Sequence, residues 1–274
     1  MKIGVRAHDF GRYSSLTQQA QDIKNAGFEC VQYAPAKAIE GITTFDAITQ
    51  EILPEIKSAF SHHNVEIAVL GCYIEPSLPD KEQRLNNVRI FSDNLSHAKH
   101  LGVPIVGTET TRLATDAPAE EREAAYQRLK DSVLRMAETA EKENVLIGIE
   151  PVASHTLNTP ALTRRLLDEV NSPKLKVIFD PVNLVLPETI HNQDQIFKAM
   201  FSLLGNEIEV MHIKDTSVEN GKLTWQKIGQ GAINYPLIFD WLKKNKPNIC
   251  LLREDAKMDS YHEDITAMKK LIKG

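Results

Sequence analysis

The chain has 274 residues, of which 42% are hydrophobic and 25% are charged. Those proportions are ordinary for a globular protein and exclude a collagen-like, coiled-coil or disordered chain. The formal net charge of -5 and the lack of any apolar run near 18 residues predict neither a nucleic-acid partner nor a membrane partner.

Short β-rich runs alternate with longer helical stretches along the whole chain. We expect eight strands, at residues 3–7, 28–33, 66–73, 105–108, 146–150, 175–180, 208–213 and 249–254. We expect helices between and after them, near residues 16–26, 45–62, 81–101, 118–143, 159–170, 193–204, 235–245 and 259–272.

Several of these helices carry start or stop signals. Ser15 is placed to cap the first helix, and Thr159 followed by Pro160 is a typical N-cap with proline at the first helical position. Gly102 ends the third helix. Pro54 falls inside the second helical stretch, so we expect a break or a late start there.

Strict alternation of strand and helix predicts a parallel sheet with its helices outside. An open doubly wound sheet and a closed barrel both satisfy that pattern. Sharing 274 residues among eight units gives about 34 residues each, near the size of one strand–helix–strand unit, which favours an eightfold β/α (TIM) barrel. The first strand is not followed by Gly-x-Gly-x-x-Gly, which argues against the dinucleotide-binding open sheet. We therefore predict a single (β/α)8 domain over residues 1–274.

The three cysteines, Cys30, Cys72 and Cys250, are far apart and each lies in an apolar, strand-like segment. Because their number is odd and their spacing fits no thiolate metal site, we expect reduced core residues. The first residues run directly into a predicted strand, without the apolar region and cleavage site of a signal peptide. We expect a cytoplasmic protein.

The last four predicted strands end in Glu150, Asp180, His212 and Glu254, at intervals of 30, 32 and 42 residues. The active site of a β/α barrel lies at the carboxyl ends of its strands, so all four side chains should meet at one mouth. Single acids or histidines at strand ends are ordinarily solvated or capping residues. Four such residues, one at the end of each of four consecutive strands, are much harder to explain in that way.

Three carboxylates that converge without a cation would repel one another, and a divalent metal ion removes that conflict. We therefore expect Glu150, Asp180, His212 and Glu254 to hold one divalent ion. One imidazole with three carboxylates suits Mn2+, which we place first, and also Mg2+, Co2+ or Zn2+. The residue types of the ligands do not distinguish among these four ions.

Five motifs together resemble the xylose-isomerase-like TIM-barrel superfamily, in particular its sugar phosphate isomerase/epimerase branch. They are Ile149-Glu150-Pro151, Phe179-Asp180-Pro181-Val182-Asn183, His212-Ile213-Lys214-Asp215, Glu254-Asp255-Ala256 and the loop from Gly229 to Tyr235. The resemblance spans essentially the whole chain. It implies a sugar or sugar phosphate as the partner molecule and proton transfer between adjacent carbons through a cis-enediolate. Glu150 and Glu254 would then be catalytic, one removing the proton and the other returning it.

One departure from the family pattern concerns Asn183. Many relatives carry histidine three residues after the metal-binding aspartate, whereas this chain has asparagine there. Asparagine can hydrogen-bond a sugar hydroxyl but cannot act as a general acid or carry a charge. The departure therefore leaves the substrate and the detailed mechanism open while the metal set is complete.

Other polar side chains should reach the same mouth and contact substrate. They are Arg6, His8, Glu109, His155, Asn183 and Lys214. Several have a plainer alternative: Arg6 could form an ion pair with a neighbour such as Glu109, Lys214 could pair with Asp215 or Glu150, and His155 could be a surface residue. The long interval before Glu254 predicts one long loop over residues 215–234, in which Trp225 either covers the site or packs.

The expected activity is a sugar isomerase or epimerase, and three other functions remain alternatives. A dehydratase of the inosose or dehydroshikimate type uses the same enediolate and then expels a β-hydroxyl. An endonuclease-IV-like repair enzyme shares the fold but needs further histidine ligands, which this chain lacks after its third and fourth strands. A non-catalytic sugar-binding protein is disfavoured by the complete ligand set. Homo-oligomers are common in the family, so one is possible here.

Overall fold

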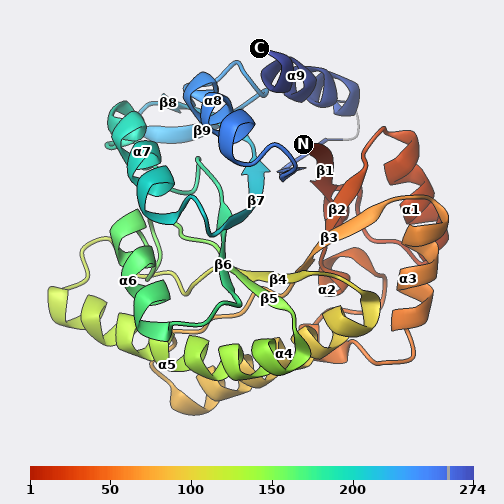
Figure 1. Cartoon of the computed structure of the whole chain (residues 1–274), viewed down its shortest axis with the longest axis horizontal. Coiled ribbons are helices and arrows are strands. Elements are labelled where there is room, and N and C mark those ends of the chain that lie inside the picture. The colour runs from red at the N-terminus through yellow and green to blue at the C-terminus, as the bar shows by residue number, and fades with distance from the viewer. Residues whose placement is uncertain (258–259) are drawn as a thin grey trace.

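The computed structural model describes residues 1–257 and 260–274. In this part of the chain, eight parallel strands close into a barrel in the order β1-β10-β7-β6-β5-β4-β3-β2 (Figure 1). The strands are β1 (Lys2–Arg6), β2 (Cys30–Tyr33), β3 (Glu66–Gly71), β4 (Ile105–Thr108), β5 (Leu146–Ile149), β6 (Leu175–Phe179), β7 (Ile208–Ile213) and β10 (Cys250–Arg253). The predicted (β/α)8 TIM barrel is confirmed.

Helices surround the barrel and bury their apolar faces against the outside of the strands (Figure 1). They are α1 (Leu16–Asn25), α2 (Pro35–Ala38), α3 (Leu53–His62), α4 (Lys81–Leu101), α5 (Ala119–Glu143), α6 (Pro160–Val170), α7 (Gln193–Leu204), α8 (Tyr235–Asn245) and α9 (Tyr261–Lys273). Short 3-10 turns occur at η1 (Ala7–Phe10), η2 (Phe45–Ala47) and η3 (Ile190–Asn192). The first residue of the last predicted helix, at position 259, lies outside the described residues.

The helix ends follow the capping signals closely. The side chain of Ser15 accepts a hydrogen bond from the backbone of Gln18 at the start of α1, and Thr159 does the same for Leu162 at the start of α6. Helix α3 begins only at Leu53, so that Pro54 occupies its first turn, where a missing N–H costs nothing. The late start expected at this proline is confirmed.

The interior of the barrel is filled by small and apolar residues. A Cβ atom at Gly107 would lie 2.8 Å from Cδ1 of Ile178, and one at Gly148 would lie 2.9 Å from the same atom. The two glycines therefore make room for the Ile178 side chain, which packs with Leu252 and other buried residues. The predicted metal ligands lie above this apolar layer, where the strands end.

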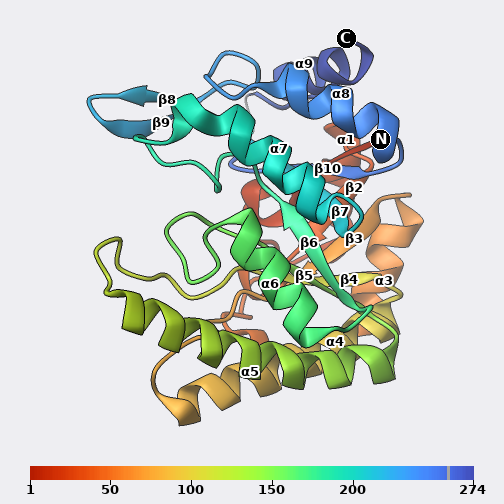
Figure 2. The ribbon, with the colours of Figure 1, turned by 60° about the vertical axis from the view of Figure 1, so that its left-hand side comes forward.

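Residues 215–226 form a hairpin where the sequence predicted a loop. Strands β8 (Asp215–Glu219) and β9 (Lys222–Gln226) pair antiparallel around Asn220 and Gly221, which have φ values of 51° and 72°. Positive φ at both central residues is the signature of a type I′ turn, for which Asn-Gly is the preferred pair. Figure 2 shows the hairpin projecting beyond the barrel on the side of the loops that follow β4 and β5.

The three cysteines are free thiols, and Cys30 and Cys72 are buried. Their state agrees with the expectation of reduced core residues, although Cys250 is only partly buried. None of the described helices is long and apolar enough to cross a membrane.

Candidate metal centre

The four predicted ligands meet at the mouth of the barrel. Glu150, Asp180 and Glu254 each follow the last residue of a strand, β5, β6 and β10, and His212 lies at the end of β7. All four side chains are buried, with at most 5% of any residue exposed. Their convergence comes directly from the barrel, which points the ends of neighbouring strands at one space.

Three of these side chains, those of Glu150, Asp180 and His212, have the spacing of a site for one ion, and Glu254 contacts the same nitrogen of His212. His212 Nδ1 lies 3.3 Å from Glu150 Oε2, 3.2 Å from Glu254 Oε1 and 3.9 Å from Asp180 Oδ2. One ligand atom each from Glu150, Asp180 and His212 lie within 4.8 Å of one another. Ligand atoms that each stand about 2.1 Å from an ion are separated by roughly 3–4 Å, so the set has the right spacing.

Gln32 fixes which nitrogen of His212 faces this space. Its Oε1 lies 2.8 Å from Nε2 of the histidine, and its amide nitrogen is hydrogen-bonded to the hydroxyl of Tyr73. A carboxamide oxygen only accepts, so Nε2 carries a proton and Nδ1 is the nitrogen that faces the carboxylates. That Nδ1 is buried without a hydrogen-bond partner among the described residues. When its proton is displaced, Nδ1 offers a lone pair to a divalent cation placed between the carboxylates.

The electrostatics of the centre reflect crowded carboxylates. Burial alone would lower the pKa of His212, but attraction by Glu150 and Glu254 raises it to about 9. Burial raises the pKa of Asp180 above its usual value. Glu254 behaves oppositely: burial opposes ionisation, yet His212, Lys214 and nearby cations hold its pKa well below the usual range. The centre thus attracts positive charge strongly, whether as protons or as a metal ion.

Lys214 lies beside the carboxylates of Asp180 and Glu254 and is 5% exposed. Its Nζ stands 2.8 Å from Asp180 Oδ2 and 2.7 Å from Glu254 Oε2. These ion pairs raise the pKa of Lys214 above its ordinary value despite the opposing effect of burial. Lys214 is thus paired with carboxylates, but with Asp180 and Glu254 and not with the expected Asp215 or Glu150. A direct contact with substrate stays a prediction.

Arg6 joins the first strand of the barrel to the last. Its guanidinium lies 3.4 Å from Glu254 Oε1, 2.9 Å from Asp9 Oδ1 and 2.6 Å from Asp255 Oδ1. Asp9 also accepts the backbone N–H of Ala256 at 3.1 Å. The ion pair anticipated for Arg6 therefore exists, with these three acids rather than with Glu109. Its effect is to orient the segment that carries Glu254.

Asn183 is hydrogen-bonded to two of the proposed metal ligands, Glu150 and Asp180. Its side-chain nitrogen donates to Glu150 Oε1 at 2.6 Å, while its backbone N–H donates to Asp180 Oδ1 at 3.1 Å. The carboxylate of Glu150 is therefore anchored through Oε1, and its Oε2 faces His212. The Asn183 amide keeps a second N–H and an oxygen for a substrate hydroxyl, and this contact stays a prediction.

The remaining predicted side chains surround the mouth. His155 Nδ1 lies 3.7 Å from Glu109 Oε2. Burial and the neighbouring Glu150 and Glu254 raise the pKa of Glu109 to about 7. Burial, Arg6 and a nearby lysine lower the pKa of His8 to about 3, so this histidine is neutral.

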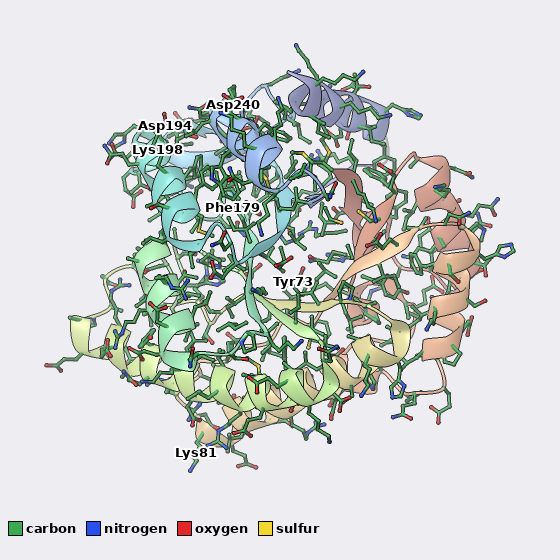
Figure 3. All side chains as sticks on the ribbon, viewed as in Figure 1. Tyr73, Lys81, Phe179, Asp194, Lys198 and Asp240 are labelled. Atoms are coloured by element: carbon green, nitrogen blue, oxygen red, sulfur yellow. The ribbon has the colours of Figure 1, made fainter. Side chains whose placement is uncertain are left out.

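Two residues near the mouth were missed by the sequence analysis. Lys37 on α2 holds its Nζ 4.0 Å over the ring of Tyr73, and Gln32 lies inside β2. Figure 3 shows Tyr73 within the ring of elements, whereas Asp194 lies on the outer side of α7. Gln32 stands two positions after the inward Cys30 and so shares its face of β2, which is the signal that could have identified it.

A family model described as xylose isomerase-like TIM barrel matches residues 20–271. The chain belongs to this family, which confirms the resemblance seen in its motifs. No curated protein matches the sequence.

Solved structures that resemble the chain include a D-tagatose 3-epimerase-like protein, with 17% identity over 100% of this chain and 97% of that one, at a TM-score of 0.80. The probable 3-DHS dehydratase AsbF from Bacillus anthracis is 16% identical over 98% and 99% of the two chains, at a TM-score of 0.74. The IolI protein with a binding zinc atom is 19% identical over 99% and 96%, at 0.71. At these identities the likeness shows the fold.

Proposed function

We propose that the protein is a metal-dependent sugar isomerase or epimerase that moves a proton between adjacent carbons of a keto sugar or keto polyol. The observation that carries this proposal is the placement of Glu150 and Glu254. Both reach within 3.3 Å of His212 Nδ1, Glu254 from β10 on one side of β7 and Glu150 from β5, two strands away on the other side, and both are buried. Membership of the family and the likeness to a D-tagatose 3-epimerase-like structure support it.

The two glutamates would act from either side of the substrate. One would remove the proton from the carbon beside the carbonyl, and the other would return a proton, with inversion in an epimerase or a 1,2-shift in an isomerase. Asn183 holds Glu150 by Oε1, which fixes the orientation of this carboxylate. Lys214 and Arg6 hold Glu254 in place through one oxygen each.

The residues fit one divalent ion, with Glu150, Asp180, His212 and Glu254 as its ligands. When bound, it would draw the substrate's carbonyl and hydroxyl oxygens together and stabilise the negative charge that develops on them. We propose Mn2+ first, with Mg2+, Co2+ and Zn2+ as alternatives. The zinc named for the IolI structure supports a divalent ion of this kind.

A dehydratase is the second candidate, and Glu109 is the observation that favours it. A pKa of about 7 leaves this carboxyl partly protonated at neutral pH, beside the two proposed catalytic glutamates. Such a group could protonate a departing β-hydroxyl, the step that distinguishes a lyase from an epimerase. The structural likeness to the probable 3-DHS dehydratase supports the same candidate.

The test is incubation of the purified chain in D2O with each of the four metal ions and a panel of ketoses, inososes, their phosphates and 3-dehydroshikimate. We expect an epimer or aldose as product, with deuterium at the carbon beside the carbonyl unless the proton is fully shielded. An unsaturated product would instead establish the dehydratase. Both products are identified by NMR.

Two variants test the roles of the glutamates. Glu150→Gln and Glu254→Gln should each abolish turnover while the circular dichroism spectrum stays unchanged. Glu138→Gln, which removes an exposed carboxylate from α5, is the matched control and should keep full activity. Activity retained in both Glu150→Gln and Glu254→Gln would refute the two-glutamate mechanism.

A further inference from the structure

A cavity of about 480 Å3 opens beside the metal centre. Its described lining comes from the β8–β9 hairpin, the end of β10 and the first turn of α9. The volume falls in the range of sites that bind small molecules. The predicted metal ligands are not part of its wall, so the proposed chemistry leaves this space without a role.

The cavity is directly adjacent to the proposed reaction site. Lys214 lines it and at the same time contacts Asp180 and Glu254. Asp255, the residue after Glu254, lines it as well. One wall of the cavity is therefore the outer side of the metal centre. A substrate bound at the metal centre that reaches past Lys214 would enter this cavity.

Trp225 of β9 forms another wall and presents an unusually exposed aromatic surface. It is 58% exposed, and its ring centroid lies 5.5 Å from Lys214 Nζ. Lys214 Nζ also lies 2.7 Å from Glu254 Oε2, so one ammonium group contacts both the indole and the carboxylate. An exposed indole beside hydrogen-bonding groups is a suitable platform for the C–H face of a sugar ring.

The charges of the cavity do not favour an anionic ligand. Four basic and four acidic residues line its described part. Arg253 pairs with Asp264 at 3.0 Å, and Lys227 pairs with Glu263. Equal numbers of basic and acidic residues give the described lining no excess of positive charge to attract a phosphate group, and they offer many donors and acceptors for hydroxyl groups. The cavity is thus suited to a neutral ligand rich in hydroxyls.

We propose that this cavity is a subsite for a second, neutral sugar ring that stacks on Trp225. The inference rests on the proposed function and narrows its substrate class: the enzyme acts on a ketose that carries a glycosidic substituent, rather than on a free monosaccharide or a sugar phosphate. The first ring occupies the metal centre, and the second lies between Trp225 and the paired charges at the start of α9.

The chain offers a direct spectroscopic test, because it has only two tryptophans. Trp241 is stacked on Phe201 with centroids 4.4 Å apart, on the outer surface between α7 and α8. Trp241→Phe therefore leaves Trp225 as the sole indole reporter. This variant, in Mg2+-containing buffer, is titrated with D-fructose, D-fructose 6-phosphate and three ketose disaccharides, lactulose, maltulose and palatinose.

We expect at least one disaccharide to change the fluorescence of Trp225 saturably, with a Kd on the order of tenfold below that of D-fructose. The inference is overturned if none of the three disaccharides does so. It is equally overturned if D-fructose 6-phosphate binds more tightly than all of them.

Kinetics separate this inference from the proposed function. Trp225→Ala should reduce the ratio of kcat/KM for the preferred disaccharide to kcat/KM for D-fructose by about five- to tenfold, and Trp225→Phe should restore part of it. Trp241→Phe should keep the ratio. Turnover with a ratio unchanged in Trp225→Ala would refute the subsite and leave the proposed function intact. Disaccharide binding without turnover of any ketose would refute the proposed function and leave the subsite intact.

Discussion

The carboxamide of Gln32 connects the side chains of His212 and Tyr73 below the mouth of the barrel, and it is itself buried. Partners of this kind hold a metal-binding imidazole in one tautomer and one orientation. Gln32 is thereby a positioning residue for the proposed centre, although it cannot reach an ion bound there.

Replacing this residue should therefore weaken metal binding while leaving the ligands in place. We expect Gln32→Ala to lower the affinity for Mn2+ by roughly 10- to 100-fold, measured by calorimetric titration of the metal-free protein. Glu138→Gln, with a substitution on the outer helix α5, is the control. An unchanged affinity in Gln32→Ala would show that His212 is oriented without it.

His8 predicts how stability depends on pH. Its pKa is lowered from 6.5 to about 3 in the folded protein, through burial and the nearby Arg6. Below pH 6.5 the unfolded chain takes up a proton that the folded chain refuses, so this residue makes stability fall as pH falls toward 3. The loss from one such group is at most about 1.4 kcal/mol per pH unit.

We expect urea unfolding of His8→Gln to show a shallower decline of the unfolding free energy between pH 6.5 and pH 4 than the natural chain. Near-ultraviolet circular dichroism at pH 7.5 checks that the variant keeps its fold. Parallel slopes for the two proteins would show that His8 is protonated in the folded state.

Single side chains divide into those that sequence predicts and those it does not. Glu150, Asp180, His212 and Glu254 were predictable, because strand direction and barrel closure alone place the residue after a strand at the mouth. The partner of Arg6 was not, since choosing Asp9 and Asp255 over Glu109 depends on which strands are neighbours and on side-chain rotamers. The contact between Gln32 and His212 was not predictable either, because it depends on how the side chains of β2 and β7 meet across the barrel interior.

At the scale of elements, the hairpin β8–β9 was the main feature missed. The long interval before Glu254 predicts a loop, and residues 215–226 lack the apolar alternation of a buried strand. Only the turn carried a clear signal, since Asn220 followed by Gly221 is the strongest local marker of a two-residue hairpin. Exposed strands that pack on little give weak patterns, and turn chemistry must then identify them.

The same turn provides a test. Gly221 has a φ of 72°, a conformation that a β-branched residue adopts only with strain, so Gly221→Val should destabilise the hairpin locally by about 1–2 kcal/mol. Hydrogen exchange of the backbone amides in residues 215–226 should accelerate roughly 5- to 30-fold, with no comparable change in α5. Equal exchange in both proteins would mean that the turn tolerates the side chain.

At the scale of the whole molecule, the fold was predictable because one period of strand and helix repeats eight times and no other architecture uses it so regularly. The order of the strands around the barrel follows from that repeat. The repeat does not predict the segments inserted at the mouth, which include α2 and the β8–β9 hairpin, or the cavity beside the hairpin. These insertions depend on loop conformations that have no period.

The crowded carboxylates predict that metal binding stabilises the entire barrel. An ion at 100 times its Kd adds about 2.7 kcal/mol to the unfolding free energy, which corresponds to a rise in Tm of roughly 5–10 °C for a domain of this size. Thermal scans with EDTA and with excess Mn2+ measure the difference. Asp180→Asn should lose most of it, and an identical Tm under both conditions in the natural chain would contradict the proposed centre.

The pairing of β1 with β10 has a consequence for the time at which the site comes into being. During synthesis β1 is made well before β10, the strand that pairs with its edge, and before the glutamate that Arg6 holds. Until β10 is in place, the growing sheet has open edges that can pair with other chains. We expect pulse-labelled refolding to protect the amides of β1 and β10 together, after those of β4 and β5. Metal capture by all four proposed ligands would then follow the pairing of β1 with β10.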